Sequence, residues 1–184
     1  MIAISTNSKT RFYRALDKLA DDPAVAKIKN YSQHKGTSTF RHCWNVAIYS
    51  FHLAEKLGWE IDEVALAKGA MLHDYYLYTV ADKQKETNIS DFRHGRTHPQ
   101  LALENAKSEF YLTLKEQNMI RSHMWPLTLF HMPMSKEAWL ISMADKYCAV
   151  REMYGDTKDL DPDVHTPWIR DLAHKKMRQV FEGV

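Results

Sequence analysis

Histidines and aspartates within apolar segments are the residues of this sequence best suited to chemistry. The chain has ten histidines, and histidine is both the commonest metal ligand and the usual proton carrier near neutral pH. His42 lies in FRHCWNVA, His73 and Asp74 follow AKGAML, and Asp145 follows WLISMA. A neutral imidazole combined with a carboxylate suits borderline metals such as Zn, Fe, Mn, Co or Ni. These four residues therefore indicate a buried metal site.

Asp145 needs a partner, because burying an unpaired carboxylate among core residues costs several kcal/mol at least. Lys146 is adjacent in sequence, but on a helix it is expected to point about 100° away. The alternative to a metal site is that His42 and His73 are hydrogen-bonded core histidines and that Asp145 belongs to a buried ion pair. For any one residue taken alone, this alternative is at least as good.

The elements that must position these residues are helices. Apolar residues recur at three- and four-residue steps, and no strand alternation of useful length competes with them. We expect the helix of His42 to begin after Ser38 and to end at Gly58, and Asp62 to cap the helix that ends at His73. Further helices are expected over residues 9–19, 23–31, 99–110, 113–124, 135–154 and 166–181, with a loop over 33–37. The fold class is therefore all-α, as a compact single-domain helical bundle.

The stretch over residues 75–97 is polar and shows no helical or strand period. A connection of this length without regular structure is uncommon in a compact domain unless it serves as a lid or a binding loop. We therefore expect a substrate-side loop here.

Composition narrows the class of protein. Apolar residues make up 45% and charged residues 26%, which is typical of a soluble globular chain. The net charge is +2, with Lys and Arg scattered among Asp and Glu, so no nucleic-acid polymer is implied as a partner. No targeting segment and no long apolar span are found, which predicts a cytoplasmic protein without membrane contact. Cys43 and Cys148 sit in apolar helical patterns and are expected to be reduced.

The ordered set of His42, His73, Asp74 and Asp145, with its local sequences FRHCWNVA, AKGAMLHDYY and LISMADKYCA, resembles the signature of the HD-domain superfamily. The resemblance spans about residues 34–155. It implies a helical bundle that binds one or two divalent metals, here a single domain over residues 1–184 with helical extensions at both ends of the core.

Two further histidines look like the additional ligands of two-metal HD proteins, namely His98 in HGRTHPQLALENA and His123 in MIRSHMWPLT. The resemblance then implies that Asp74 bridges two ions, with His42, His73 and Asp145 completing one site and His98 and His123 the other. The alternative is a single metal ion, with His98 and His123 as phosphate-binding or helix-terminal residues beside it.

The resemblance implies a metal-dependent phosphohydrolase that acts on a phosphomonoester or phosphodiester of nucleotide type. Its metals would acidify a water to hydroxide and bind the phosphoryl oxygens, with Asp74 and His73 at the catalytic centre. Residues expected to contact the substrate are His34, Lys68, Arg93, His94 and Arg96. Each of the three cations could equally be a solvated surface residue, and His94 could instead replace a ligand.

Two other functions are compatible with the same set of residues. Some HD proteins with this six-ligand pattern hold a mixed-valent di-iron centre and oxidise carbon with O2. Others could bind a nucleotide without cleaving it, although a complete ligand set argues against that reading. The residues select neither a particular substrate nor the native metal, and a homo-oligomer remains open.

Overall fold

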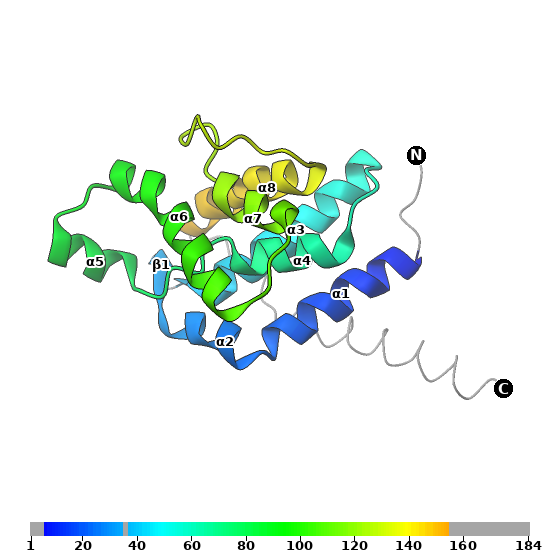
Figure 1. The fold of residues 1–184 in the computed structure, drawn as a ribbon, viewed down its shortest axis with the longest axis horizontal. Coiled ribbons are helices and arrows are strands. Elements are labelled where there is room, and N and C mark those ends of the chain that lie inside the picture. Colours follow the sequence, from blue (N-terminus) through cyan, green and yellow to red (C-terminus); the bar gives the residue numbers. More distant parts are fainter. Residues whose placement is uncertain (1–5, 35–36, 155–184) are drawn as a thin grey trace.

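The computed structural model describes residues 6–34 and 37–154, and helices dominate this part of the chain (Figure 1). The helix expected over residues 166–181 lies outside the described residues. In chain order the elements are α1 (Thr6–Ala20), α2 (Pro23–Ala26), the 3-10 helix η1 (Lys27–Asn30), β1 (Ser32–His34), β2 (Thr37–Ser38), α3 (Thr39–Leu57), α4 (Glu63–Leu72), α5 (Val80–Thr87), α6 (Asp91–Glu109), α7 (Leu114–Ser122) and α8 (Lys136–Met153). The predicted all-α fold is confirmed.

The helices that carry the candidate ligands begin and end at the expected capping residues. The Ser38 hydroxyl accepts a hydrogen bond from the backbone N–H of Arg41, and Gly58 closes α3 in the left-handed region with φ of 63°. The Asp62 carboxylate accepts from the N–H of Ala65, and α4 ends with His73 as its C-cap. Such caps satisfy backbone groups that a helix terminus leaves without an intrahelical partner. They fix where along each helix the ligand side chains emerge.

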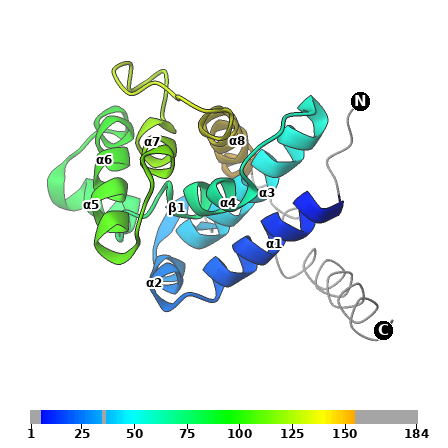
Figure 2. The same cartoon turned by 45° about the vertical axis from the view of Figure 1, so that its right-hand side comes forward.

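Helix α4 lies at the centre of the bundle and contacts α1, α3, α7 and α8 (Figure 2). Three of its ten residues are alanine and one is glycine, and these small residues allow its neighbours to approach closely. A Cβ added at Gly69 would lie only 2.5 Å from the Met119 sulfur and 3.2 Å from Cδ1 of Ile141. On the α1 side, the stacked rings of Phe12 and Phe51 lie 4.3 Å apart in the core. This packing holds the C-terminal end of α4 at the meeting point of several helices.

The prediction of a loop over residues 75–97 is wrong for most of this stretch, because α5 and the first turns of α6 lie within it. Asn88 ends α5 in the left-handed region, and the Ser90 side chain caps α6. Helix α5 buries none of its residues, so it carries no apolar period that a sequence reading could detect. The helix expected to start at Pro99 instead starts at Asp91, and Pro99 lies inside it.

Two shorter segments also differ from expectation. Residues 33–37 were expected to form a loop, but β1 and β2 pair there as a small antiparallel hairpin, too short to show alternation in sequence. The single helix expected over residues 23–31 is one α-helical turn, α2, followed by η1. The hairpin matters for function because it leads directly into α3 and its first candidate ligand.

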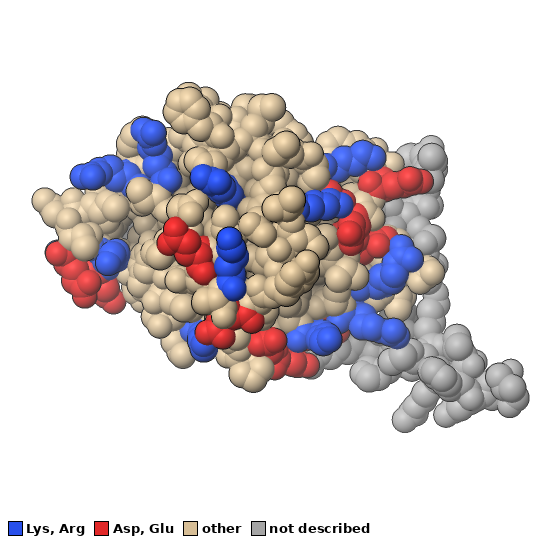
Figure 3. All heavy atoms as spheres, in the orientation of Figure 1, with Lys and Arg blue, Asp and Glu red and all other residues tan. Residues whose placement is uncertain are grey.

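The surface carries charge of both signs. On the face shown in Figure 3, basic and acidic side chains are interspersed. Among the described helices, none combines the length and the apolar character needed to cross a membrane.

Candidate metal centre

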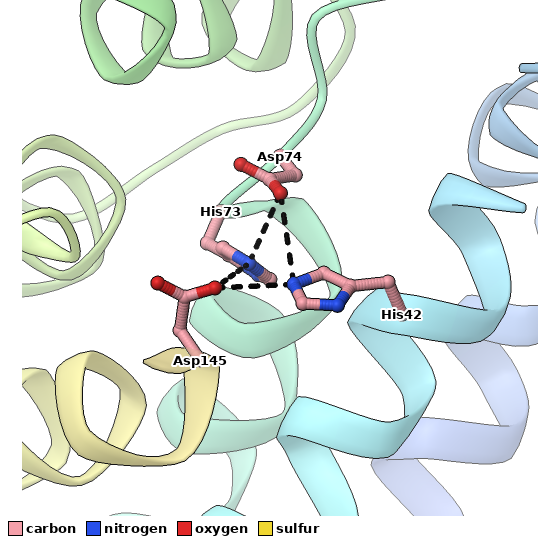
Figure 4. A group of neighbouring side chains, drawn as sticks. All are labelled: His42, His73, Asp74 and Asp145. Atoms are coloured by element: carbon pink, nitrogen blue, oxygen red, sulfur yellow. Dashed lines mark hydrogen bonds and ion pairs between the residues drawn. The ribbon is translucent and has the colours of Figure 1, made fainter. Parts of the chain in front are cut away.

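Four buried side chains from three helices converge at the end of α4 (Figure 4). His42 comes from α3, His73 and Asp74 from the end of α4, and Asp145 from α8. The Nε2 atom of His42 lies 3.1 Å from Oδ1 of Asp145 and 3.7 Å from Oδ2 of Asp74. The Nε2 atom of His73 lies 3.4 Å from Oδ2 of Asp74 and 3.7 Å from Oδ1 of Asp145. The structure thus brings together all four residues that the sequence singled out first.

A second group forms on the other side of Asp74. His98 from α6 and His123 at the end of α7 place their Nε2 atoms 3.1 Å and 3.4 Å from Oδ1 of Asp74. Within each group the candidate ligand atoms all lie within 4.8 Å of one another. Asp74 therefore presents Oδ2 to His42 and His73 and Oδ1 to His98 and His123, which is the arrangement of a bridging carboxylate.

All four histidines are held through Nδ1. His73 and His123 each place Nδ1 2.7 Å from a backbone carbonyl of their own helix, that of Ala70 and Ile120 respectively. For His98 the carbonyl of His94 is 2.9 Å away. The Nδ1 atom of His42 instead faces a carboxylate oxygen of Glu152 at 2.9 Å.

Because carbonyl and carboxylate oxygens only accept hydrogen bonds, Nδ1 must carry the proton in each ring. The neutral tautomer then leaves a lone pair on Nε2, and in every case Nε2 is the atom that faces the centre. This is the usual outer support of metal-binding histidines, which fixes both tautomer and ring orientation.

The donor set fits a metal ion better than a network of hydrogen bonds. His98 and His123 point their Nε2 atoms at each other at 2.8 Å, where two lone pairs would repel unless a proton or a cation lay beside them. Moreover, Nε2 of His73 and Oδ1 of Asp74 are buried and face other candidate ligand atoms at 3.1 to 3.7 Å without the geometry of a hydrogen bond. Imidazole nitrogens and carboxylate oxygens gathered in this way are the donors that Zn, Mn, Fe and Co accept.

Electrostatics also favour a cation. Burial opposes protonation of His42, but the carboxylates of Asp145 and Glu152 outweigh it and raise the pKa of His42 to about 10. Burial likewise opposes ionisation of Asp74, yet attraction to the neighbouring imidazoles, that of His73 first, holds the pKa of Asp74 well below the usual range. For His123, burial dominates and lowers the pKa to about 3. Protons therefore balance the buried carboxylates when metal is absent, and metal ions must compete with them.

Two residues at the centre were missed or misplaced by sequence reasoning. The amide of Gln33, on β1, donates to Oδ2 of Asp74 at 2.5 Å. Lys146 was expected to point away, but its flexible side chain curls back, and Nζ donates to the His123 carbonyl at 2.7 Å and lies 3.7 Å from Oδ2 of Asp145. The only sequence signals for them were their positions, one in the hairpin before the first ligand helix and the other next to the last ligand.

Lys68, one of the expected substrate contacts, is engaged with residues at the start of α7 and just before it. Its ammonium donates to the Tyr111 carbonyl and lies 3.4 Å from the Glu116 carboxylate. Glu116 is in the first turn of α7, whereas His123 follows the last turn of that helix. Lys68 therefore links α4 to the end of α7 that is remote from the metal ligands.

His94 lies beside the second group of ligands. Its ring stacks on that of His98 with centroids 4.8 Å apart, and Nδ1 lies 3.2 Å from the Tyr78 hydroxyl. Because His94 is one helical turn before His98 and is partly exposed, it borders the centre without belonging to either group of candidate ligands.

The remaining expected substrate contacts are less informative. Arg93 and Arg96 are exposed on α6, and the Arg96 guanidinium lies over the ring of Phe92. The backbone of His34 belongs to β1, but its side chain lies outside the described residues.

The comparisons with known proteins agree with this geometry. The sequence model of the HD domain matches residues 39–150, which is more than half of the chain and includes all six candidate ligands. No curated protein and no solved structure matches the chain. On the strength of the family match, this chain belongs to the HD-domain family.

Proposed function

We propose that this protein is a metal-dependent phosphohydrolase that cleaves a phosphomonoester or phosphodiester of nucleotide type. The observation that carries the proposal is the sharing of Asp74 between two buried groups of ligands, one carboxylate oxygen for each. Membership of a family of metal-dependent hydrolases supports the same reaction class.

His42, His73, Asp145 and Oδ2 of Asp74 would hold one ion, and Oδ1 of Asp74 with His98 and His123 would hold the second. When bound, such ions lower the pKa of a water molecule to near neutrality and neutralise charge on phosphoryl oxygens.

The protein's own groups supply orientation and charge. Hydrogen bonds at Nδ1 keep the imidazole rings from turning, which preserves the arrangement of donors between turnovers. The Lys146 ammonium lies 3.7 Å from Oδ2 of Asp145, on a side chain that is 42% exposed. It donates to the His123 and Ser142 carbonyls, so an incoming anion would compete with these oxygens for it. Two divalent ions together with Lys146 would outweigh the buried carboxylates of Asp74, Asp145 and Glu152, and this balance favours an anionic substrate.

The test is a hydrolysis panel under controlled oxygen. Purified protein loaded with Mn²⁺, Co²⁺ or Fe²⁺ is given nucleoside monophosphates, cyclic nucleotides and simple aryl phosphates, and released phosphate or alcohol is measured in air and under anaerobic conditions. We expect metal-dependent ester cleavage that needs no oxygen and disappears in Asp74→Ala.

The matched control is Asp62→Ala, which removes a carboxylate from the opposite end of α4. It should retain activity at a temperature where both variants are folded. Cleavage of no ester with any metal would overturn the proposal, and oxygen-dependent turnover of an iron-loaded sample would favour a di-iron oxygenase instead.

A further inference from the structure

A third buried carboxylate stands behind the candidate ligands without touching the centre itself. Glu152 lies on α8, seven residues after Asp145, which puts both on the same face of that helix. Its Oε2 accepts a hydrogen bond from Nδ1 of His42 at 2.9 Å, and its Oε1 accepts one from the Asn45 side-chain amide at 3.1 Å. The side chain is fully buried. Both carboxylate oxygens are therefore fixed, and one is fixed on a candidate ligand.

This support distinguishes His42 from the other three histidines. His73, His98 and His123 direct Nδ1 at neutral backbone carbonyls. A carboxylate acceptor withdraws the Nδ1 proton more strongly than a carbonyl does, so it raises the basicity of the opposite nitrogen. His42 should therefore be the strongest imidazole donor of the set.

The group of ligands around His42 also has more donors and more negative charge than the group around His98. The group around His42 has four donor residues, two of them carboxylates, and Glu152 adds a third negative charge directly behind it. The group around His98 has three donor residues, and its single carboxylate is the shared Asp74. A divalent cation is held more strongly where more donors and more negative charge converge.

We infer that the two sites load in a fixed order, with the first ion held tightly by His42, His73, Asp74 and Asp145, and that Glu152 sets this preference through His42. The ion at His98 and His123 is then the exchangeable one, with more of its coordination positions left to water and substrate. This inference rests on the two-metal site of the proposed function, but it concerns binding rather than hydrolysis.

The first experiment is a metal titration in which the protein competes with a chromophoric chelator for Mn²⁺ or Co²⁺. Wild-type protein should show one tight and one weaker equivalent. His123→Ala should lose the weaker equivalent and keep the tight one. Two equivalents of equal affinity in the wild type, or loss of the tight equivalent in His123→Ala, would overturn the loading order.

The second experiment isolates Glu152. In the His123→Ala background, which leaves one site to measure, Glu152→Gln keeps the shape of the side chain and removes its charge. We expect affinity for the remaining ion to fall about 10- to 100-fold, the range seen when an outer partner of a metal ligand is lost. Unchanged affinity would refute the role of Glu152.

The matched control is Glu137→Gln, which neutralises another buried carboxylate of α8 that binds Lys115 and the backbone of Asp62. It should leave metal affinity unchanged, and an equal loss would show that the Glu152 effect is only structural. Wild-type protein that loads in order but cleaves no ester would remove the proposed function and leave this inference standing. Protein that cleaves an ester but whose metal affinity is unchanged by Glu152→Gln would support the proposed function and remove this inference.

Discussion

Replacing Asp74 with alanine should abolish metal binding at both candidate sites. Among the described residues, Asp74 is the carboxylate that belongs to both groups of candidate ligands. Its oxygens lie 3.1 to 3.7 Å from the Nε2 atoms of the four histidines. Asp74→Ala therefore removes a donor from each site at once, whereas His123→Ala removes one from a single site.

The size of the effect follows from linkage. An ion present at 100 times its dissociation constant stabilises the folded state by about 2.7 kcal/mol. For a chain of 184 residues, each kcal/mol shifts the melting temperature by roughly 2–4 °C. Each ion should therefore raise the melting temperature of the wild type by about 5–11 °C. Asp74→Ala should show almost none of this rise, with a helical circular dichroism spectrum close to that of the wild type.

The assay is thermal unfolding with and without Mn²⁺, after chelator treatment, alongside elemental analysis. Asp62→Ala is the control, because the loss of this N-cap costs about 1 kcal/mol while the metal ligands stay in place. Its melting temperature should fall in both conditions, with the metal-dependent rise preserved. An Asp74→Ala protein that keeps two equivalents of metal, or the full rise, would refute the reasoning.

Three further changes test the packing, the electrostatics and the anion contact. Gly69→Val should destabilise the fold by about 1–3 kcal/mol in urea unfolding, because its Cβ would lie 2.5 Å from the Met119 sulfur; unchanged stability would contradict the close packing of α4. Burial alone would raise the pKa of Glu63, but its hydrogen bonds, those from Arg11 foremost, together have the larger effect and lower the pKa below its usual value of 4.5. Stability from this pair is present above pH 4.5 and lost as pH falls through the lowered pKa. The melting-temperature deficit of Arg11→Met should therefore shrink on acidification, and a constant deficit would count against the ion pair. Lys146→Met should retain metal but raise KM for an anionic ester roughly tenfold, equivalent to about 1.4 kcal/mol, and an unchanged KM would exclude the contact.

The ligand helices could be read from the sequence because their signals are local. Ser38, Gly58 and Asp62 are capping residues at the termini where capping residues are expected. The apolar runs between them set which residues are buried. His42, His73 and Asp145 could therefore be placed at the core, and the resemblance to the HD family supplied the pairing of His98 with His123.

The parts that sequence reasoning missed depend on tertiary contacts. Helix α5 buries nothing, so no period marked it. Gln33 reaches Asp74 only because the hairpin folds over the end of α4, and Lys146 reaches the His123 carbonyl only through the bend of a long side chain. The partners of Lys68, Tyr111 and Glu116, could not be read from the sequence because they are more than forty residues away in the chain.

The most direct test of the central claim is anomalous X-ray diffraction from crystals grown with saturating Mn²⁺. Two anomalous peaks roughly 3.5–4 Å apart, one on either side of the Asp74 carboxylate, would show that the buried imidazoles and carboxylates hold a pair of ions. No anomalous peak at these residues, or a single peak that leaves His98 and His123 without metal, would contradict the two-metal centre.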